Sequence, residues 1–256
     1  MSSFNAVDVS EWNGDINWND AYADGVRYAF IRAGFGQDSE SQDDKYFHIN
    51  MENALKAGVK VGVYFYAYAT DYDSAVGEAE HCIRLIEPYR DKISFPVFYD
   101  IEEQKCVPRI KDIVDGFRNK MEYHGYNVGV YTAISWYDAY FQPIDIDYIW
   151  IASWGSDDGK PHTKPQWCDV WQYTSHGSVN GIAKASYYID QYGNKCYTSG
   201  VDCDIVYNEN MHLLINQDPI PDPEPEKNIY IDISVPEGCN VYINNQLIDV
   251  NKHIEG

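Results

Sequence analysis

Two acidic side chains, Asp100 and Glu102, are the residues of this sequence best suited to chemistry. They end an apolar run that begins at Phe95, and a β-strand covered on both faces has this composition. Because side chains alternate across a strand, the two acids should point to the same face, with their backbones about 6.6 Å apart. Carboxyl groups this close at the end of an apolar strand repel each other, so one should keep its proton at neutral pH. A protonated acid beside an ionised one is the equipment for cleaving a glycosidic bond.

The alternative is that this acidic pair lies on a solvated strand edge, and the surrounding elements bear on the choice. Up to residue 132, apolar runs alternate with amphipathic stretches of helical period, whereas three further apolar runs follow without a long helical stripe between them. The expected strands are residues 6–9, 28–32, 61–68, 95–100, 127–132, 148–152, 169–173 and 201–206. The expected helices are residues 19–23, residues 46–56, a stretch capped by Asp73 that carries Val76, Ala79, Ile83 and Ile86, and a stretch between Pro108 and Gly125.

This order of elements predicts an α/β fold whose parallel strands close into a TIM-like barrel with a helix-poor closing part. Barrel enzymes work at the carboxyl ends of their strands. The residues expected there are Asp8, Arg32, Tyr64, Tyr66, Asp100, Glu102, Tyr131, Trp154, Gln172, Tyr173 and Asp202. Four acids would thus converge with several aromatic rings, which suit the faces and hydroxyl groups of sugars.

The composition argues against several classes of function. A net charge of −21 disfavours nucleic acid as a partner, because such binding depends on Lys and Arg at phosphate groups. The sequence has no run of 18 apolar residues, so no membrane insertion is expected. The first residues show no basic segment followed by an apolar one, so no secretory signal is expected in this sequence.

The cysteines and acids do not predict a metal site or a cofactor. Cys82, Cys106, Cys168, Cys196, Cys203 and Cys239 form no C-x-x-C pair, which disfavours a zinc cluster. Cys196 and Cys203 could form a disulfide in an oxidising compartment, and the sequence leaves this open. The four acids expected at the strand ends could hold a hard cation, but no histidines accompany them at helix or strand spacing, so metal-dependent chemistry is disfavoured.

The domain organisation changes after residue 217. Residues 218–228 are rich in proline and acidic residues and are expected to form a stiff linker. Residues 229–256 contain alternating apolar runs around Asn244-Asn245 and predict a short β segment. This tail is too short for a core of its own, so it is expected to be the start of a longer module or to self-associate.

Five stretches of residues 5–210 together resemble the glycoside hydrolase family 25 lysozymes, the N-acetylmuramidases of phages and bacteria. They occur in the same order as in that family. The stretches are Val7-Asp8-Val9-Ser10-Glu11-Trp12-Asn13-Gly14 with Ile16-Asn17-Trp18, Phe30-Ile31-Arg32-Ala33-Gly34, Ala57 to Tyr64, Tyr99-Asp100-Ile101-Glu102, and Trp171-Gln172-Tyr173-Thr174 with Gly177-Ser178-Val179 and Val201-Asp202-Cys203-Asp204. The resemblance implies a flattened barrel of five βα units followed by three strands, with residues 1–217 as the catalytic barrel.

The resemblance also implies roles for individual residues. Glu102 would be the general acid, Asp100 its partner, and Asp8 and Asp202 flanking acids that hold substrate and raise the pKa of the acid. The remaining residues expected at the strand ends, including Tyr64 and Tyr131, would bind substrate. Two departures stand out: residues 182–200 form a longer link than is usual, which makes Asp204 a rival to Asp202, and Tyr66 stands where relatives often have His.

The implied reaction is hydrolysis of the β-1,4 bond between N-acetylmuramic acid and N-acetylglucosamine in bacterial peptidoglycan. A spacing of about 6.6 Å lies near the lower limit for inversion and is too wide for a simple carboxylate nucleophile, which favours assistance by the acetamido group of the substrate. A chitinase-like glycosidase is disfavoured because Phe98 stands two residues before Asp100, where a D-x-D-x-E pattern needs an acid. A wall-binding lectin is the non-enzymatic alternative. The expected place of action is the cell wall, reached by a phage lysin at lysis or by a secreted enzyme whose signal has been removed.

Overall fold

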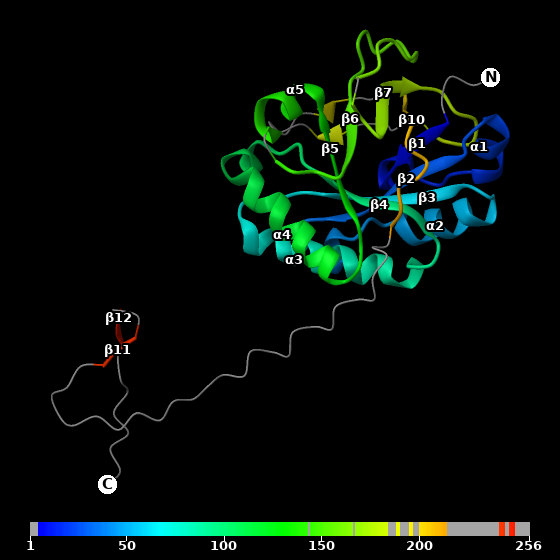
Figure 1. Ribbon diagram of the computed structural model, residues 1–256. Helices are drawn as coiled ribbons and strands as arrows, with labels where there is room; N and C mark the ends of the chain where they lie inside the picture. The colour runs from blue at the N-terminus through cyan, green and yellow to red at the C-terminus, as the bar shows by residue number, and fades with distance from the viewer. Residues whose placement is uncertain are drawn as a thin grey trace. The chain divides into compact units, whose positions relative to one another are not determined.

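Eight β-strands form a closed barrel (Figure 1). The computed structural model describes residues 5–142, 144–165, 167–183, 188–189, 195–196, 200–213, 241–243 and 246–248. The barrel strands are β1 (Ala6–Val9), β2 (Tyr28–Phe35), β3 (Lys60–Tyr66), β4 (Ile93–Asp100), β5 (Val128–Ala133), β6 (Tyr148–Ala152), β7 (Val170–Gly177) and β10 (Val201–Val206). Their order around the barrel is β1-β10-β7-β6-β5-β4-β3-β2. The predicted α/β barrel is confirmed.

Helices connect the first five strands and become short afterwards. They are α1 (Trp18–Asp24), α2 (Phe47–Lys56), α3 (Tyr72–Ile86) and α4 (Ile110–Tyr123), with the 3₁₀ turns η1 (Glu11–Asn13), η2 (Glu40–Gln42), η3 (Glu87–Tyr89) and η4 (Gln104–Arg109). After β5, the described residues contain only α5 (Ile134–Trp136) and the π-helical turn η5 (Tyr137–Phe141). The helix-poor closing part of the barrel is therefore confirmed. None of the described helices is both long and apolar enough to cross a membrane.

The first turn of α3 shows how local sequence sets a helix start. The Asp71 carboxylate accepts a hydrogen bond from the Ser74 backbone N–H at 2.9 Å, and Ser74 Oγ accepts one from the Asp71 N–H at 3.1 Å. This reciprocal pair satisfies N–H groups that the helix leaves without partners. The predicted cap at Asp73 was wrong: Asp73 lies within the first turn, because Asp71 has the extended backbone that a capping residue needs.

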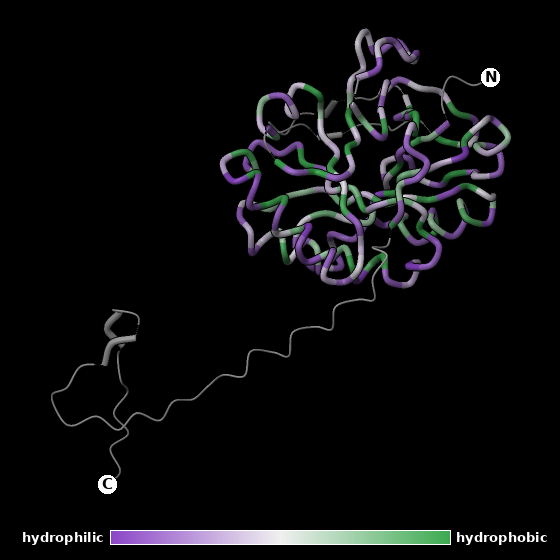
Figure 2. Tube along the Cα trace, viewed as in Figure 1, coloured by the Kyte–Doolittle hydropathy of each residue, from purple (hydrophilic) through white to green (hydrophobic). Residues whose placement is uncertain are grey.

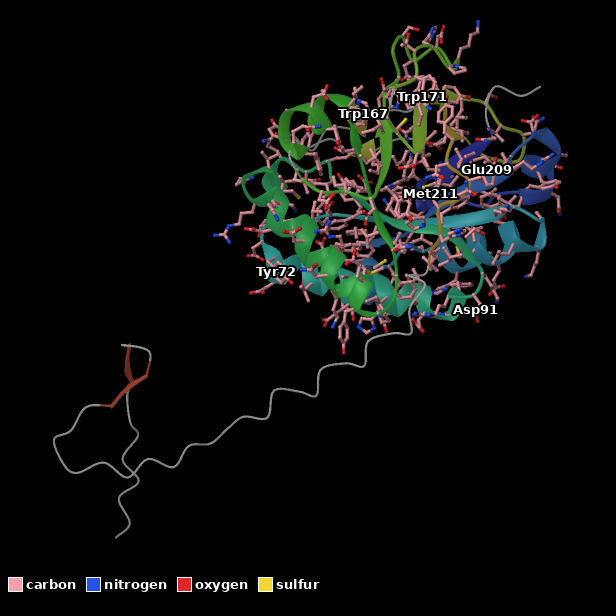
Figure 3. The ribbon with its side chains drawn as sticks, viewed as in Figure 1. Tyr72, Asp91, Trp167, Trp171, Glu209 and Met211 are labelled. Atoms are coloured by element: carbon pink, nitrogen blue, oxygen red, sulfur yellow. The ribbon has the colours of Figure 1, made fainter. Side chains whose placement is uncertain are left out.

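Two apolar layers hold the barrel. The outer layer lies between strands and helices, and the hydrophobic stretches of the chain run largely through the strands (Figure 2). The inner layer fills one half of the barrel interior, where Met211, labelled in Figure 3, packs among aromatic rings. The residues of this layer are Ala6, Tyr28, Phe30, Tyr64, Phe95, Phe98, Tyr131, Trp150, Ala152, Val170, Val206 and Met211. It is a packed core rather than a channel.

Two glycines make room for these rings. A Cβ atom added to Gly62 would lie 2.6 Å from Phe30 Cδ1, and one added to Gly129 would lie 2.5 Å from Phe98 Cε1. Both distances are far below van der Waals contact, so glycine at these two inward positions allows the rings to pack against the backbone. The ring centroids of Phe30 and Trp150 lie 4.7 Å apart, and those of Phe98 and Trp150 lie 5.5 Å apart.

Strand β10 runs in the opposite direction to the other barrel strands. It pairs antiparallel with β1 on one side and with β7 on the other, whereas β1 to β7 pair in parallel. A strand parallel to β7 would need a crossover connection, usually a helix, and the described part of residues 178–200 contains none. The reversal brings the first residues of β10, rather than the last, to the carboxyl ends of the parallel strands.

The C-terminal part is described only in short pieces. The chain divides into two units, Met1–Ile220 and Pro221–Gly256, and the second contains an antiparallel pair formed by β11 (Val241–Ile243) and β12 (Gln246–Ile248). The predicted linker, residues 218–228, lies outside the described residues, as does most of the predicted segment 229–256. In the first unit, β8 (Tyr188–Ile189) pairs with β9 (Lys195–Cys196). Cys203 is a free buried thiol, and the side chain of Cys196 lies outside the described residues.

Candidate active site

Four of the predicted site residues take the next inward-facing position after the apolar inner layer. Asp8 comes two residues after Ala6, and Asp100 comes two residues after Phe98, so strand alternation turns each acid toward the interior. Both acids are buried, at 7% and 4% exposed. The same step of two residues leads from Phe30 to Arg32 and from Val170 to Gln172, whereas Tyr64 and Tyr131 belong to the inner layer itself. On β1, β2, β4 and β7 the inner face therefore changes from apolar to polar over one step.

Asp100 and Glu102 come together at this end of the barrel. Burial raises the pKa of Asp100 well above its ordinary value, and the negative charge of Glu102 is the strongest charge effect on it, followed by that of Asp8. Glu102 lies two residues beyond Asp100 and reaches solvent. Protein atoms nevertheless surround its carboxyl group closely enough that lost hydration raises its pKa to about 7, and the charges of Asp8 and Glu103 add to this shift. The pair therefore binds protons more tightly than free carboxyl groups do.

Asp202 joins this group because β10 is antiparallel. It lies directly opposite Asp8 in the register between β1 and β10. Burial raises its pKa well above the ordinary value, and the charges of Asp8, Glu102 and Asp157 act in the same direction. In a parallel strand, a residue in the second position would lie at the other end of the barrel, away from Asp8 and Glu102.

Asp204, the rival to Asp202, lies deeper. It is fully buried, and the Trp150 indole Nε1 donates a hydrogen bond to its Oδ1 at 2.9 Å. Its Oδ2 has no hydrogen-bond partner among the described residues, and its carboxyl group interacts with that of Asp8, which favours a proton on one of the two acids. Burial together with the charges of Asp8 and Asp202 raises the pKa of Asp204 well above its ordinary value. Asp204 is thus the member of this pair that retains a proton.

Gln172 fixes the orientation of Asp8. Its amide Nε2 donates to Asp8 Oδ2 at 2.8 Å, and its Oε1 accepts from Tyr131 OH at 3.0 Å and from Trp154 Nε1 at 2.8 Å. With two donors on the oxygen, the amide has one orientation. Gln172 is only 3% exposed, so it supports Asp8 and two rings from within the barrel. The pKa of Asp8 is about 6, because the effect of burial exceeds the opposing effect of the hydrogen bonds from Gln172 and Asp204.

Arg32 influences the acidic group through its positive charge, while its guanidinium is bound by two other carboxylates. Its Nε donates to Asp44 Oδ2 at 2.9 Å and its NH2 group to Glu11 Oε1 at 3.0 Å. The positive charge lowers the pKa of Asp100, opposing the effects of burial and of the neighbouring acids. The sequence did not indicate that Asp44 and Glu11 hold Arg32, because both follow strand ends in loops without a periodic pattern.

The aromatic candidates divide into two groups. Tyr64 and Tyr131 are buried among the acids, and Tyr66 OH donates to Glu103 Oε1 at 3.0 Å beside Asp100 and Glu102. Trp154 is 40% exposed. The structure does not bring Tyr173 into the group, because it follows the inward-facing Gln172 and therefore points into the outer layer.

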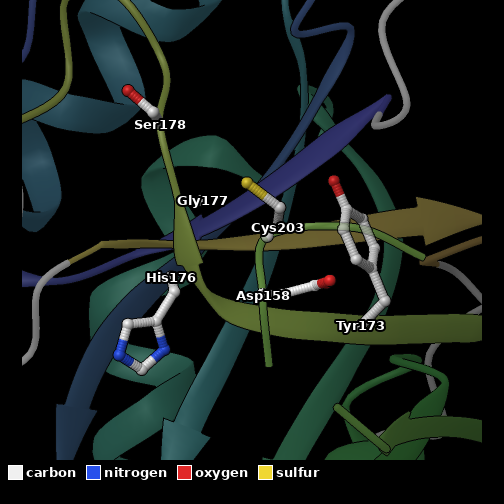
Figure 4. Close-up of a pocket in the computed structure, with 7 residues that line it drawn as sticks. Asp158, Tyr173, His176, Gly177, Ser178 and Cys203 are labelled. Atoms are coloured by element: carbon white, nitrogen blue, oxygen red, sulfur yellow. The ribbon is translucent and has the colours of Figure 1, made fainter. Parts of the chain in front are cut away.

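Tyr173 instead lines a pocket on the outer side of β7 and β10, together with Cys203, His176 and Asp158 (Figure 4). This pocket contains none of the acids expected at the strand ends. Tyr173 and Cys203 both belong to the outer layer of the core. The pocket is therefore separate from the acidic group inside the barrel.

Asp157 anchors the loop that carries Trp154. Among the described residues, it alone has a positive φ without being glycine, at 47°. Its carboxylate accepts hydrogen bonds from Thr174 Oγ1 at 2.6 Å, from Ser175 N–H at 2.9 Å and from His176 Nδ1 at 2.6 Å. These bonds tie the loop after β6 to the end of β7, which offsets the cost of the left-handed backbone. No sequence pattern indicated this role.

Two exposed rings that the sequence interpretation did not include also follow strand ends. Trp12 lies in η1 after β1, and Tyr68 lies after β3. They are 42% and 38% exposed, which is unusual for large aromatic side chains. No group of three or more His, Cys, Asp or Glu side chains within the described ranges is arranged to hold a metal ion.

Comparison with known proteins agrees with this geometry. The family model described as glycosyl hydrolases family 25 matches residues 7–182. Lysozyme M1 of Streptomyces globisporus is 27% identical over 197 residues, which cover 71% of this chain and 65% of that protein. The autolytic lysozyme of Clostridium acetobutylicum is 28% identical over 178 residues, which cover 69% of this chain and 52% of that protein. The chain therefore spans between half and two thirds of the length of these curated relatives.

Solved structures share the barrel. A family 25 glycosyl hydrolase from Bacillus anthracis aligns with a TM-score of 0.60 and 26% identity, covering 83% of this chain and 95% of that one. The catalytic domain of the endolysin ply40 from bacteriophage P40 of Listeria monocytogenes aligns with a TM-score of 0.63, covering 80% and 93%, and at 24% identity it supports the fold alone. With the family match extending over most of the barrel, the chain belongs to glycosyl hydrolase family 25.

Proposed function

We propose that this protein is a peptidoglycan hydrolase that cleaves the β-1,4 bond between N-acetylmuramic acid and N-acetylglucosamine. The observation that carries the proposal is the position of Glu102, an accessible acid with a pKa of about 7 beside the buried Asp100. A general acid is most effective when its pKa lies near the working pH. Membership of family 25 and the similarity to two proteins named lysozymes support the choice of substrate.

In the proposed reaction, substrate binding leaves the shared proton on Glu102 and a negative charge on Asp100. Glu102 gives its proton to the glycosidic oxygen as the bond from that oxygen to C1 of the muramic acid unit breaks. The acetamido oxygen of the same sugar forms a bond to C1, and Asp100 accepts a hydrogen bond from the acetamido N–H. Glu102 then removes a proton from water, whose oxygen attacks C1 and opens the cyclic intermediate with overall retention.

Asp202 is proposed as the flanking acid and Asp204 as its support. Asp202 faces Asp8 across the strand pair and interacts with Glu102, whereas the charges acting on Asp204 come from Asp8 and Asp202. Tyr64, Tyr66, Tyr131 and Trp154 remain candidates for substrate contact. The cell wall would be the site of action, reached either at phage lysis or by secretion. The C-terminal segment would bind wall or self-associate, which sedimentation with and without residues 218–256 would distinguish.

Mass spectrometry of digested, purified wall tests the proposed bond. After reduction of the new ends, fragments should carry reduced muramic acid, whereas reduced glucosamine would overturn the assignment. Glu102→Gln should lower the rate by at least about 100-fold, because it removes the proton donor. Asp91→Asn is a matched control: Asp91 is exposed just before β4, at the opposite end of that strand from Asp100, and should leave the rate unchanged. Equal wall release by the wild type and Glu102→Gln would favour a different catalytic group, and binding without turnover would favour a lectin.

A further inference from the structure

Lys105 carries a positive charge three residues after Glu102 in the chain. It lies in η4, which begins directly after Glu102-Glu103, and its side chain is exposed. Its Nζ lies 3.8 Å from the ring centroid of Tyr68. A cation at this distance from an aromatic face is attracted by the electrons of the ring, so the ammonium group has a preferred position despite its flexible stem.

The Tyr68 ring that holds this cation is itself fixed. It makes edge-to-face contacts with Phe35, at 5.6 Å between centroids, and with Tyr66, at 5.4 Å. The Tyr68 backbone N–H donates to the buried Glu78 Oε1 at 2.9 Å. Tyr66 OH also donates a hydrogen bond to Glu103, the residue next to Glu102. Contacts therefore run from Lys105 through Tyr68 and Tyr66 to Glu103.

The charge of Lys105 is not neutralised by an ion pair within the described part of the chain. Lys45, Lys56, Lys111 and Lys120 each lie within 4.0 Å of a carboxylate, and no such partner exists for Lys105 among the described residues. Arg32, another cation at this end of the barrel, is bound by Asp44 and Glu11. An exposed cation without a carboxylate partner, on a rigid aromatic support, is ready to bind an anion from solution.

We propose that Lys105, held on Tyr68, binds a carboxylate group of the glycan substrate and so selects peptidoglycan over neutral glycans. The inference rests on the proposed function. Peptidoglycan carries carboxylates on its lactyl ether or stem peptides, and chitin-like chains carry none. A protein with a net charge of −21 repels such a polymer, so a cation beside the acids offsets this repulsion where the substrate must enter.

Initial rates on soluble peptidoglycan strands, native or with their carboxyl groups converted to neutral amides, test this. Lys105→Met keeps the apolar stem and removes the charge. It should lower kcat/KM on native strands by roughly three- to fivefold, mainly through KM, as expected for one exposed charge pair. The loss should disappear on amidated strands, and Lys105→Arg should restore the native rate. Lys56→Met, which makes the same change in net charge on α2, is the control.

Strands stripped of stem peptides by an amidase expose a lactyl carboxylate that is bound as an amide in native strands. Disappearance of the loss in Lys105→Met on these strands assigns the carboxylates of the stem peptide, and a persistent loss shows that Lys105 also binds the lactyl carboxylate exposed in their place. Equal rates for Lys105→Met and Lys56→Met on native strands would overturn the inference, as would an equal loss on amidated strands. The wild type tests the proposed function by itself: if it releases no muramic acid ends, that function is refuted. If the wild type releases them and Lys105→Met is as active as the wild type, only the role of Lys105 is refuted.

Discussion

The two halves of the barrel interior use the same strands for opposite purposes. One half is an apolar layer in which Phe30, Phe98 and Trp150 pack against one another, with ring centroids 4.7 to 5.5 Å apart. The other half, one step of two residues further along the parallel strands, is lined by acids whose pKa values burial raises. Under the proposed function, stability and chemistry would be separated along the strands rather than between domains.

This separation has an energetic consequence. Burying apolar rings stabilises the folded state, whereas burying several carboxyl groups with few counter-charges destabilises it at the pH where they ionise. The apolar half therefore offsets the cost of the acidic half. Substitutions in the two halves should consequently change stability in opposite directions.

The largest expected difference is between Phe98→Ala and Asp100→Asn. Phe98 is fully buried among rings, so its truncation should lower the free energy of unfolding by roughly 3–5 kcal/mol. Asp100→Asn removes a buried acid next to Glu102 and should raise the free energy of unfolding at pH 8, while hydrolysis falls. Denaturant unfolding of both variants at pH 8 measures this. Equal destabilisation would contradict the division of roles.

Asp204→Asn and Asp204→Leu test whether Asp204, at the boundary of the two halves, only supports its neighbours. Asparagine can still accept from Trp150 and donate to Asp8, as a protonated Asp204 does, so hydrolysis should stay within about threefold of the wild type. Leucine leaves the Trp150 N–H without a partner, at a cost of about 1–3 kcal/mol of stability, and frees Asp8. If Asp204→Asn abolished hydrolysis while Asp202→Asn did not, Asp204 rather than Asp202 would be the site acid.

The acidic half also predicts how stability depends on pH. The folded-state pKa values of Asp8 and Glu102, about 6 and about 7, lie above the ordinary values of 3.8 and 4.5. Between these limits the folded state holds more protons than the unfolded state, so the free energy of unfolding should fall as pH rises from 5 to 8. Urea midpoints across this range measure the slope, which Asp8→Asn should reduce. A rising midpoint would refute the raised pKa values.

The smallest expected effect compares two exposed tryptophans. Trp154 follows β6 at the acidic end and bonds Gln172, whereas Trp167 precedes β7 and packs on Tyr137, with ring centroids 4.3 Å apart. Loss of one aromatic contact with a sugar should raise KM by roughly two- to tenfold in Trp154→Ala. Trp167→Ala should leave KM unchanged. Equal values of KM for the two variants would remove Trp154 from the proposed substrate contacts.

Strand alternation made much of this arrangement predictable from sequence. Apolar runs of period two identified the barrel strands, and the position after each run identified Asp8, Asp100 and Glu102. The same rule would have excluded either Gln172 or Tyr173, because consecutive residues cannot share a face. The period says nothing, however, about strand direction, so the reversal of β10 that brings Asp202 to the site was not predictable from it.

Contacts between residues far apart in the sequence were equally hard to predict. The bonds from Asp157 to His176 and from Trp150 to Asp204 join residues 19 and 54 positions apart, and neither pair shows a local pattern. The structure was also needed to show that Lys105 has no carboxylate partner among the described residues, whereas Lys111 and Lys120 have one. Sequence thus predicted which residues line the interior, and the structure supplied which of them support one another.

Infrared difference spectroscopy between pH 5 and 8 shows whether Asp100 and Glu102 hold a proton near neutral pH. Protonated and ionised carboxyl groups absorb at different frequencies, so the two states can be told apart. The acidic end should show a protonated carboxyl band that disappears with an apparent pKa near 7, and Glu102→Gln should remove part of that band. If all carboxyl groups ionise below pH 5 in both proteins, no proton is held at Asp100 and Glu102 for transfer to the glycosidic oxygen, and the account fails.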